Sequence, residues 1–174
     1  MFAITERLLL RPGWAEDAAA LTQAIGDQEI ARNLTRVHWP YTIDDAESFL
    51  GLPQHPMRPS FLICLRGSNQ LIGGIGLHGD PDAELGYWIA RDQWNRGYAT
   101  EAGRAVLALA DNSLRLARIK AQRAVDNARS ANVLRKLGFL PTGKKMWSAS
   151  LARGAMETLL YTRDREEASQ ALAA

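Results

Sequence analysis

The stretch from Ala83 to Leu114 most constrains the fold, because it combines a short apolar strand with a helix that begins near a glycine. The segment "AELGYWIA" follows the turn "DPD" and predicts a strand. The helix that follows has apolar residues at i, i+3, i+4, i+7 and i+8, namely Ala102, Ala105, Val106, Leu109 and Ala110. The strand "IKAQRAV" comes next, so a parallel strand–helix–strand crossover is expected.

The rest of the chain adds strands on both sides of this unit. We expect a strand at "ITERLLLR", helices at 14–25 and 43–50, and strands at 60–67 and 70–79 joined by a turn. A helix at 127–139 and two final strands at 140–150 and 155–163 complete the pattern. Strands joined by short turns pair antiparallel. The sequence therefore predicts an α/β (α+β) fold with a mixed, mostly antiparallel central sheet flanked by helices.

The length and charge of the chain limit its organisation and partners. Its 174 residues suit a single domain, with a core at about 4–163 and a charged tail at 164–174 that is helical or frayed. A formal net charge of +2 argues against a nucleic-acid partner but suits one anionic ligand. The sequence contains no signal-peptide pattern and no apolar run of about 20 residues, so we expect a cytoplasmic protein without a membrane partner. The lone Cys64 is interpreted as core packing.

The start of the helix near Gly97 is a candidate anion site. The first turn of a helix leaves amide N–H groups without partners and carries a partial positive charge. Gly97 has no Cβ to obstruct an anion, and Arg96 adds a cation. An ordinary strand-to-helix turn explains the same residues equally well. The glycine pattern at 74–79, "GIGLHG", is a weaker candidate because a second strand follows it where a nucleotide-binding loop requires a helix.

Two segments together resemble a known family. "GYWIARDQWNRGYATEA" followed by "DNARSANVLRKLGF" resembles the GNAT superfamily of acetyl-CoA-dependent N-acetyltransferases, in particular the ribosomal-protein N-terminal acetyltransferases. "TERLLLRP" and "HWPYTIDDAESFL" also fit this branch, so the resemblance covers about residues 4–163. It implies a sheet in which two strands splay apart to hold acetyl-CoA. The chain departs from the family's Q/R-x-x-G-x-G/A loop at its first position, where it has Trp94.

The resemblance also implies which residues hold the cosubstrate. The pyrophosphate would lie on the loop, and the pantetheine arm would follow the preceding strand. The amide N–H of Ile89 or Ala90 would face the thioester oxygen. The residues expected to bind acetyl-CoA are Trp88, Ile89, Ala90, Asn95, Arg96, Gly97, Tyr98, Ala99, Thr100, Asn127, Asn132 and Arg135. Asn127 is also a candidate helix cap, and Ile89 and Arg135 fit core and surface roles as well.

Acetyl transfer to an amine needs a base for the amine and a proton donor for the leaving thiolate. Glu84 at the start of the strand is the candidate base, and a solvated edge carboxylate is the alternative. Many family members have a tyrosine acid where this chain has Leu134. Ser130 is therefore the candidate acid, and a hydroxyl in the first turn of its helix is the alternative.

The acceptor is the least determined part of the prediction. His38, Trp39 and Tyr41 form an aromatic loop that is expected to line the acceptor pocket, with Trp147 and Tyr161 as further candidates. The first expectation is the α-amine of a peptide or protein. A small-molecule amine (a polyamine, amino acid or aminoglycoside) or a non-catalytic acyl-CoA-binding module are the alternatives. We expect no metal site, and the late strands make a homodimer possible.

Overall fold

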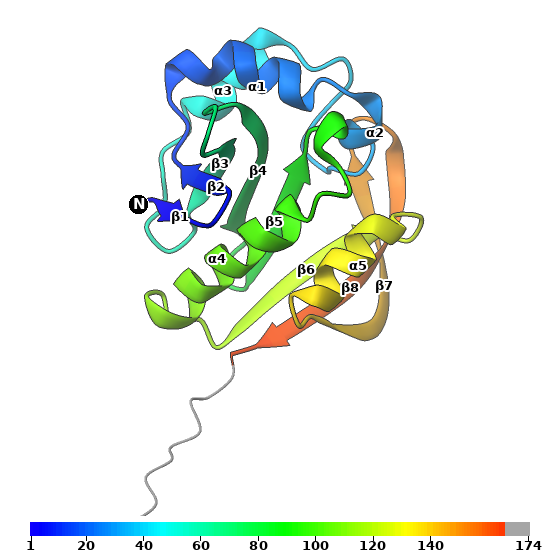
Figure 1. Cartoon of the computed structure of the whole chain (residues 1–174). Coiled ribbons are helices and arrows are strands. Elements are labelled where there is room, and N and C mark those ends of the chain that lie inside the picture. Colours follow the sequence, from blue (N-terminus) through cyan, green and yellow to red (C-terminus); the bar gives the residue numbers. More distant parts are fainter. Residues whose placement is uncertain (166–174) are drawn as a thin grey trace, which may run out of the picture.

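The computed structural model describes residues 1–165 (Figure 1). Most of the predicted charged tail, residues 166–174, lies outside the described residues. The eight strands described form one sheet in the order β1-β2-β3-β4-β5-β6-β8-β7. The strands are β1 Ala3–Ile4, β2 Leu8–Arg11, β3 Ser60–Leu65, β4 Leu71–His78, β5 Ala83–Ile89, β6 Arg118–Ala124, β7 Leu140–Ser150 and β8 Gly154–Asp164. The helices are η1 Ala15–Asp17, α1 Ala18–Ile25, α2 Gln28–Ala31, α3 Ile43–Leu50, η2 Arg91–Gln93, α4 Tyr98–Asn112 and α5 Ala128–Lys136.

The predicted mixed sheet is confirmed. β3, β4 and β5 pair antiparallel through short turns, whereas β5 and β6 are parallel and are joined through α4. α3 occupies the predicted residues because Thr42 and Asp45 form a capping box at its start. α5 begins at the predicted cap, where the Asn127 side chain accepts a hydrogen bond from the Ser130 amide.

The first predicted strand was wrong in one respect, because it is two strands. β1 and β2 form an antiparallel hairpin around a turn at Thr5–Arg7. The Thr5 hydroxyl accepts a hydrogen bond from the Leu8 amide at 3.0 Å, and the Thr5 amide donates to the Leu8 carbonyl at 2.9 Å. A threonine that bonds to nearby backbone groups favours a turn over a continuous strand. The short helix α2 was not predicted.

The two faces of the sheet are covered by different helices. On one face Leu85, Ile89 and the inner side of α4 share the larger hydrophobic core, and Tyr87 packs against it. On the opposite face Trp88 packs against the smaller core, which includes Ala18 of α1 and Ala46 of α3. Successive residues of β5 alternate between these faces. We call the first the α4–α5 face and the second the α1–α3 face.

β5 and β6 are paired only at their beginning. Ala83 pairs with Ile119 and Glu84 with Lys120, and the strands diverge beyond these residues (Figure 1). β6 continues along β8, to which it pairs over its whole length. The sheet is therefore open between the carboxyl-terminal parts of β5 and β6. This agrees with the two splayed strands that the family resemblance implied.

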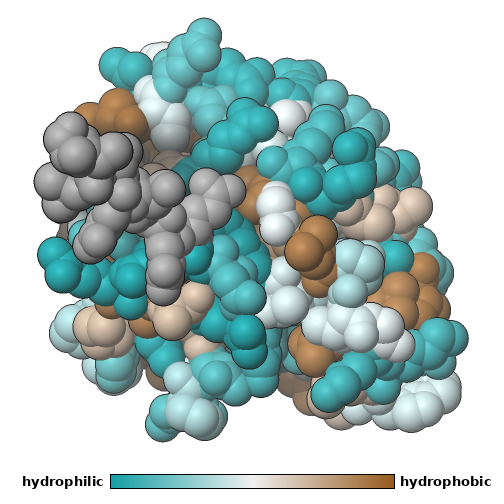
Figure 2. Space-filling model, turned by 90° about the horizontal axis from the view of Figure 1, so that it is seen from below, coloured by the Kyte–Doolittle hydropathy of each residue, from teal (hydrophilic) through white to brown (hydrophobic). Residues whose placement is uncertain are grey.

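The surface carries both hydrophilic and hydrophobic residues, as is usual for a globular protein. On the face drawn in Figure 2, hydrophilic residues predominate and hydrophobic residues form separate patches. None of the helices within residues 1–165 is both long and apolar enough to cross a lipid bilayer.

Candidate active site

A cleft of about 990 Å³ lies where β5 and β6 diverge. Its walls come from β5, the start of α4, the end of β6, α5, and the segment around α2. Because the sheet is open here, the cleft connects its two faces. Two reactants can therefore enter from opposite sides and meet at the edge of β5.

The first turn of α4 supplies main-chain donors to this cleft. Gly97 precedes the helix with a φ of 82°, a conformation that only glycine adopts readily. The first backbone hydrogen bond of the helix runs from Glu101 N–H to the Gly97 carbonyl at 3.0 Å. Among residues 1–165 no partner is seen for the N–H groups of Tyr98, Ala99 and Thr100, and no side chain caps the helix. Three unpaired donors at the positive end of a 15-residue helix suit a phosphate group.

Trp94, which departs from the family's loop pattern, closes the base of this loop. Its indole N–H donates to the Ile89 carbonyl at 2.7 Å, so it joins the loop to the end of β5. The Arg129 guanidinium of α5 lies 4.8 Å from the centre of its ring. A cation over an indole face is attractive. Trp94 therefore links both walls of the cleft through its ring.

Gln93 is a second group in the cleft without its full set of partners. Its side chain is buried, and its amide N–H donates to Asp92 at 2.9 Å. Its Oε1 atom has no hydrogen-bond partner within the described part of the chain. A buried acceptor of this kind is costly unless a ligand or water satisfies it. The orphaned oxygen and the three free amides of α4 thus both fit a bound polar ligand.

A carboxylate marks the α1–α3 side of the cleft. Glu84 is partly buried, and its Oε2 atom accepts a hydrogen bond from the Gln122 amide at 3.0 Å. Gln122 is held in turn by the hydroxyls of Ser148 and Thr158, at 3.2 and 3.3 Å. His78, directly opposite Glu84 on β4, places its Nε2 atom 3.6 Å from Glu84 Oε1. Glu84 is therefore fixed by neighbours on both sides.

A pair of hydroxyl groups marks the α4–α5 side. The Tyr87 hydroxyl lies 2.8 Å from the Ser130 hydroxyl of α5. Burial raises the pKa of Tyr87 to about 12, although the hydrogen bond to Ser130 opposes the shift. The phenol therefore keeps its proton throughout the physiological range. Since Glu84 and Tyr87 point to opposite faces of β5, a carboxylate and a proton donor stand on the two sides of the opening.

The register of β5 leaves a main-chain donor at the opening. Residues of an antiparallel pair alternate between those that exchange hydrogen bonds and those that do not. The Ala90 N–H donates to the Ile72 carbonyl of β4 at 2.8 Å, so Ala90 is a bonded position and Ile89 is not. The N–H of Ile89 therefore points away from β4, toward the gap beside β6. Of the two amides considered for the thioester oxygen, only that of Ile89 has the required direction.

Most of the predicted site residues line this one cleft, although they come from three separate segments. They are Glu84, Trp88, Ile89, Asn95, Gly97, Tyr98, Ala99, Thr100, Asn127, Ser130 and Asn132.

The other predicted residues lie outside the lining of the cleft. Ala90 is buried at the end of β5, and Arg96 and Arg135 are exposed. Arg129 and Lys136 are the basic residues of α5 that line the cleft, where Arg135 was expected.

The predicted aromatic loop also lies elsewhere. The His38 ring is 2.7 Å from Asp45 of the α3 capping box, Trp39 is 42% exposed, and Tyr41 packs against the smaller core. Glu29, Ile30 and residues 32–35, in and after α2, line the cleft instead. The contact between His38 and Asp45 holds this loop at the start of α3, so the loop does not reach the opening between β5 and β6.

Several lining residues were missed, and two of them had a detectable signal. Strict alternation along "AELGYWI" places Tyr87 on the face opposite Glu84. The short turn between β4 and β5 fixes the register that sets His78 beside Glu84. The positions of Gln93 and Gln122 could not be predicted in this way, because they depend on the divergence of β5 and β6 and on contacts with β7 and β8.

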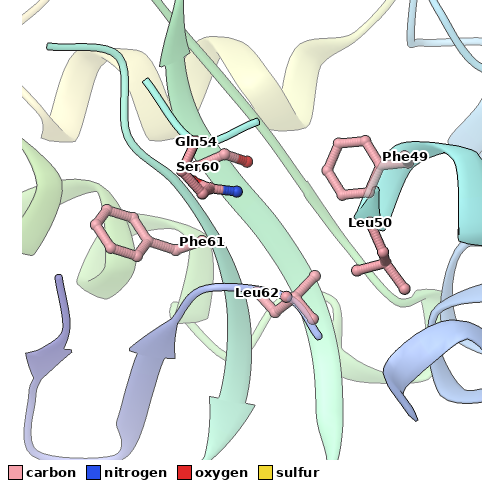
Figure 3. Close-up of a pocket in the computed structure, with 7 residues that line it drawn as sticks. Phe49, Leu50, Gln54, Ser60, Phe61 and Leu62 are labelled. Atoms are coloured by element: carbon pink, nitrogen blue, oxygen red, sulfur yellow. The ribbon is translucent and has the colours of Figure 1, made fainter. Parts of the chain in front are cut away.

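A second, much smaller pocket shares no lining residue with the cleft. A pocket of about 10 Å³ between α3 and β3 is bordered by Phe49, Leu50 and Leu62, and has room for about one water molecule (Figure 3). Within residues 1–165 no three His, Cys, Asp or Glu side chains gather closely enough to hold a metal ion.

Comparison with known proteins identifies the family. Residues 7–140 match the acetyltransferase (GNAT) domain family. The chain is 32% identical over 154 residues to the uncharacterized N-acetyltransferase YoaA of Bacillus subtilis, covering 82% of this chain and 86% of that protein. Its fold is similar to that of a GNAT-family acetyltransferase from Bacillus anthracis, with a TM-score of 0.83, 26% identity and coverage of 96% and 100% of the two chains.

The third comparison is with a structure that contains bound coenzyme A. A ribosomal L7/L12 alpha-N-protein acetyltransferase in complex with coenzyme A has a TM-score of 0.81 and 19% identity, with coverage of 94% of this chain and 98% of that one. At this identity the likeness concerns the fold. The matched domain and the identity to YoaA show that the chain belongs to the GNAT acetyltransferase family and is an N-acetyltransferase that takes its acetyl group from acetyl-CoA.

Proposed function

We propose that this enzyme acetylates the α-amine of a peptide or protein by direct attack of the amine on the thioester. The observation that carries the proposal is the position of Glu84 and of the Tyr87–Ser130 pair on opposite faces of β5, at an opening through the sheet. An amine that enters from the α1–α3 face meets a carboxylate. A thioester held from the α4–α5 face meets hydroxyl donors.

The proposed cosubstrate site uses the groups described above. The amides of Tyr98, Ala99 and Thr100 would bind the pyrophosphate, and Asn127 and Asn132 line the path along α5. Bound acetyl-CoA supplies an activated acyl group with a thiolate as the leaving group. Holding the two reactants together removes part of the barrier, because a bimolecular step becomes effectively unimolecular.

The protein groups then assist each stage of the transfer. Glu84 accepts the proton of the attacking amine, directly or through a water molecule. The N–H of Ile89 donates to the carbonyl oxygen as that oxygen gains negative charge. The Ser130 hydroxyl, which is hydrogen-bonded to the Tyr87 hydroxyl, donates its proton to the departing sulfur. An amide and a free thiol result, and no covalent enzyme intermediate forms. Glu84 has then gained one proton and the Tyr87–Ser130 pair has lost one, so transfer of a proton through solvent returns both to their starting states.

The acceptor class follows from the acidity of amines. A free α-amine has a pKa of about 8 and a lysine side chain one of about 10.4. At pH 7 roughly one α-amine in ten is neutral, and far fewer lysine amines are. A single carboxylate such as Glu84 is a weak base, so it can assist the deprotonation of an α-amine but not that of a lysine side chain. The name of the neighbouring α-N-protein acetyltransferase supports the same acceptor class.

A panel of amines tests this acceptor. Thiol release is measured with a short peptide that has a free α-amine, with the same peptide blocked at that amine and carrying one internal lysine, and with a polyamine and an aminoglycoside. We expect turnover of the first peptide and almost none of the blocked one, with mass spectrometry placing the acetyl group on the α-nitrogen. A polyamine or aminoglycoside turned over at least about 10-fold faster would establish the small-molecule alternative.

The proposed proton donors give a prediction of their own. Ser130→Ala and Tyr87→Phe should each lower kcat by about 10-fold to 100-fold with little change in the KM for acetyl-CoA, because general acid catalysis acts mainly in the transition state. If the two hydroxyls act as a unit, the double variant should be no slower than the slower single variant. Steady-state kinetics with the best acceptor measure this. Wild-type kcat in both single variants would mean that the thiolate obtains its proton elsewhere.

A further inference from the structure

A side chain from the N-terminal hairpin holds the loop that precedes α4. Arg7 lies in the turn between β1 and β2, and its Nη1 atom donates to the Arg96 carbonyl at 3.0 Å. Its Nε and Nη2 atoms each lie 2.7 Å from Glu101 Oε2. The guanidinium also stacks 4.6 Å from the centre of the Tyr98 ring. One side chain thus contacts the residue before Gly97, the residue after it, and Glu101 in the first turn of the helix.

This loop depends on such outside contacts. Asn95 and Gly97 both have positive φ values, 62° and 82°, a conformation that asparagine and glycine adopt more readily than other residues. The three amides that follow point the same way without internal partners. Trp94 fixes the base of the loop through its bond to the Ile89 carbonyl, and the Glu101 N–H bonds to the Gly97 carbonyl. The contacts from Arg7 also favour this arrangement.

Arg7 also neutralises a charge that would oppose an anion. Glu101 lies in the first turn of α4, near the proposed pyrophosphate site. It accepts hydrogen bonds from the Thr5 hydroxyl at 2.6 Å and from the Arg7 amide at 2.9 Å, in addition to the guanidinium. Burial raises the pKa of Glu101, but these bonds outweigh it and lower the pKa overall, so the carboxylate is ionised. Paired with Arg7, its charge is compensated.

We propose that Arg7 is a positioning residue for acetyl-CoA, holding the loop at Arg96–Glu101 so that the amides of Tyr98, Ala99 and Thr100 face the pyrophosphate. The inference rests on the proposed binding of the pyrophosphate at this loop. It also requires an arginine, since a lysine ammonium cannot bridge the carbonyl and the carboxylate as a planar fork does.

A purely structural role for Arg7 makes a different prediction, which a truncated cosubstrate can separate. S-Acetylpantetheine carries the same thioester and arm as acetyl-CoA but lacks the pyrophosphate and the nucleotide. Loss of a loop-positioning residue should weaken acetyl-CoA binding alone. Loss of general stability or of the cleft's shape should weaken the binding of both compounds.

The test compares Arg7→Ala with wild type by calorimetric titration of acetyl-CoA and of S-acetylpantetheine, which needs no acceptor amine. We expect the Kd for acetyl-CoA to rise by about 10-fold to 100-fold, as misplaced binding groups typically cause, and that for S-acetylpantetheine to stay within about 2-fold. Equal losses for both compounds, or no loss for either, would overturn the proposal. Circular dichroism establishes that the variant is folded.

Two further variants keep the result decisive. Arg66→Ala is the matched control, because the Arg66 side chain donates to the Thr5 and Glu6 carbonyls of the same turn and, within residues 1–165, forms no hydrogen bond or ion pair with the loop. It should leave the Kd for acetyl-CoA unchanged, and a loss equal to that of Arg7→Ala would assign the effect to the hairpin as a whole. If Arg7→Ala does not fold, Arg7→Lys replaces it, with a smaller selective loss expected and an unchanged Kd counting against the proposal.

Discussion

Replacing Gly97 by valine is expected to weaken acetyl-CoA binding by about 100-fold while the protein remains folded. Gly97 has a φ of 82°, in which a β-branched residue is strained by roughly 1–3 kcal/mol. The loop can relieve that strain only by turning, and the N–H groups of Tyr98 and Ala99 turn with it. Hydrogen bonds to a charged group contribute about 1.5–3 kcal/mol each, so misdirecting one or two accounts for the loss. Calorimetric titration measures it.

A second glycine with the same backbone conformation serves as the control. Gly143 in β7 has a φ of 76°, has open space at its Cβ position, and lies outside the lining of the cleft. Gly143→Val should cost similar stability in thermal unfolding yet leave the affinity for acetyl-CoA unchanged. If Gly97→Val is folded and binds acetyl-CoA as wild type does, the α4 loop is not the pyrophosphate site. In that case the inference about Arg7 fails as well, whereas an effect at Gly97 without one at Arg7 would overturn only the latter.

Replacing Glu84 by glutamine should lower kcat/KM by about 10²-fold or more near pH 7 on a peptide with a free α-amine. The substitution preserves the shape and the contact with Gln122 but removes the base. At a pH below its pKa of about 8, the acceptor amine is mostly an ammonium ion and needs a base to lose its proton. At a higher pH the amine is already neutral. The ratio of wild-type to variant rates should therefore be largest at low pH and shrink as the pH rises from about 6 to 9.5.

The same series of rates separates catalysis from general effects of charge. Glu157→Gln, on β8 and paired with Lys145 at 3.3 Å, removes one carboxylate outside the lining of the cleft. Its rates should follow those of wild type at every pH. A ratio for Glu84→Gln that stays flat from pH 6 to 9.5 would exclude Glu84 as the base. A peptide acetylated only on its lysine would contradict the proposed acceptor class instead.

The fold was largely predictable because its signals are local. The periodicity of α4, the Thr42–Asp45 capping box and the Asn127 cap each act within a few residues, and the structure places these helices where they were expected. The hairpin at β1 and β2 was missed since the Thr5 hydroxyl, which favours the turn, is also compatible with a strand. The four-residue helix α2 is too short to produce a recognisable period.

The site was predictable only where a motif carried it. Of the residues that the family resemblance assigned to acetyl-CoA, Asn95, residues 97–100 and the start of α5 line the cleft. The pairing of Tyr87 with Ser130 joins residues 43 positions apart, and the contact of Arg7 with Glu101 joins residues 94 positions apart. Neither pair has a fixed spacing that a single sequence reveals. The aromatic loop at His38–Tyr41 has the composition of a binding wall, but its contacts with α3 keep it away from the opening.

A crystal structure with bound coenzyme A tests the central claim most directly, because it locates the cosubstrate without assuming an acceptor. We predict pyrophosphate oxygens within hydrogen-bond distance of the N–H groups of Tyr98, Ala99 and Thr100, and the sulfur between β5 and β6, next to the Tyr87–Ser130 pair. Coenzyme A bound with its pyrophosphate away from the start of α4, or with its sulfur on the α1–α3 side next to Glu84, would contradict this account.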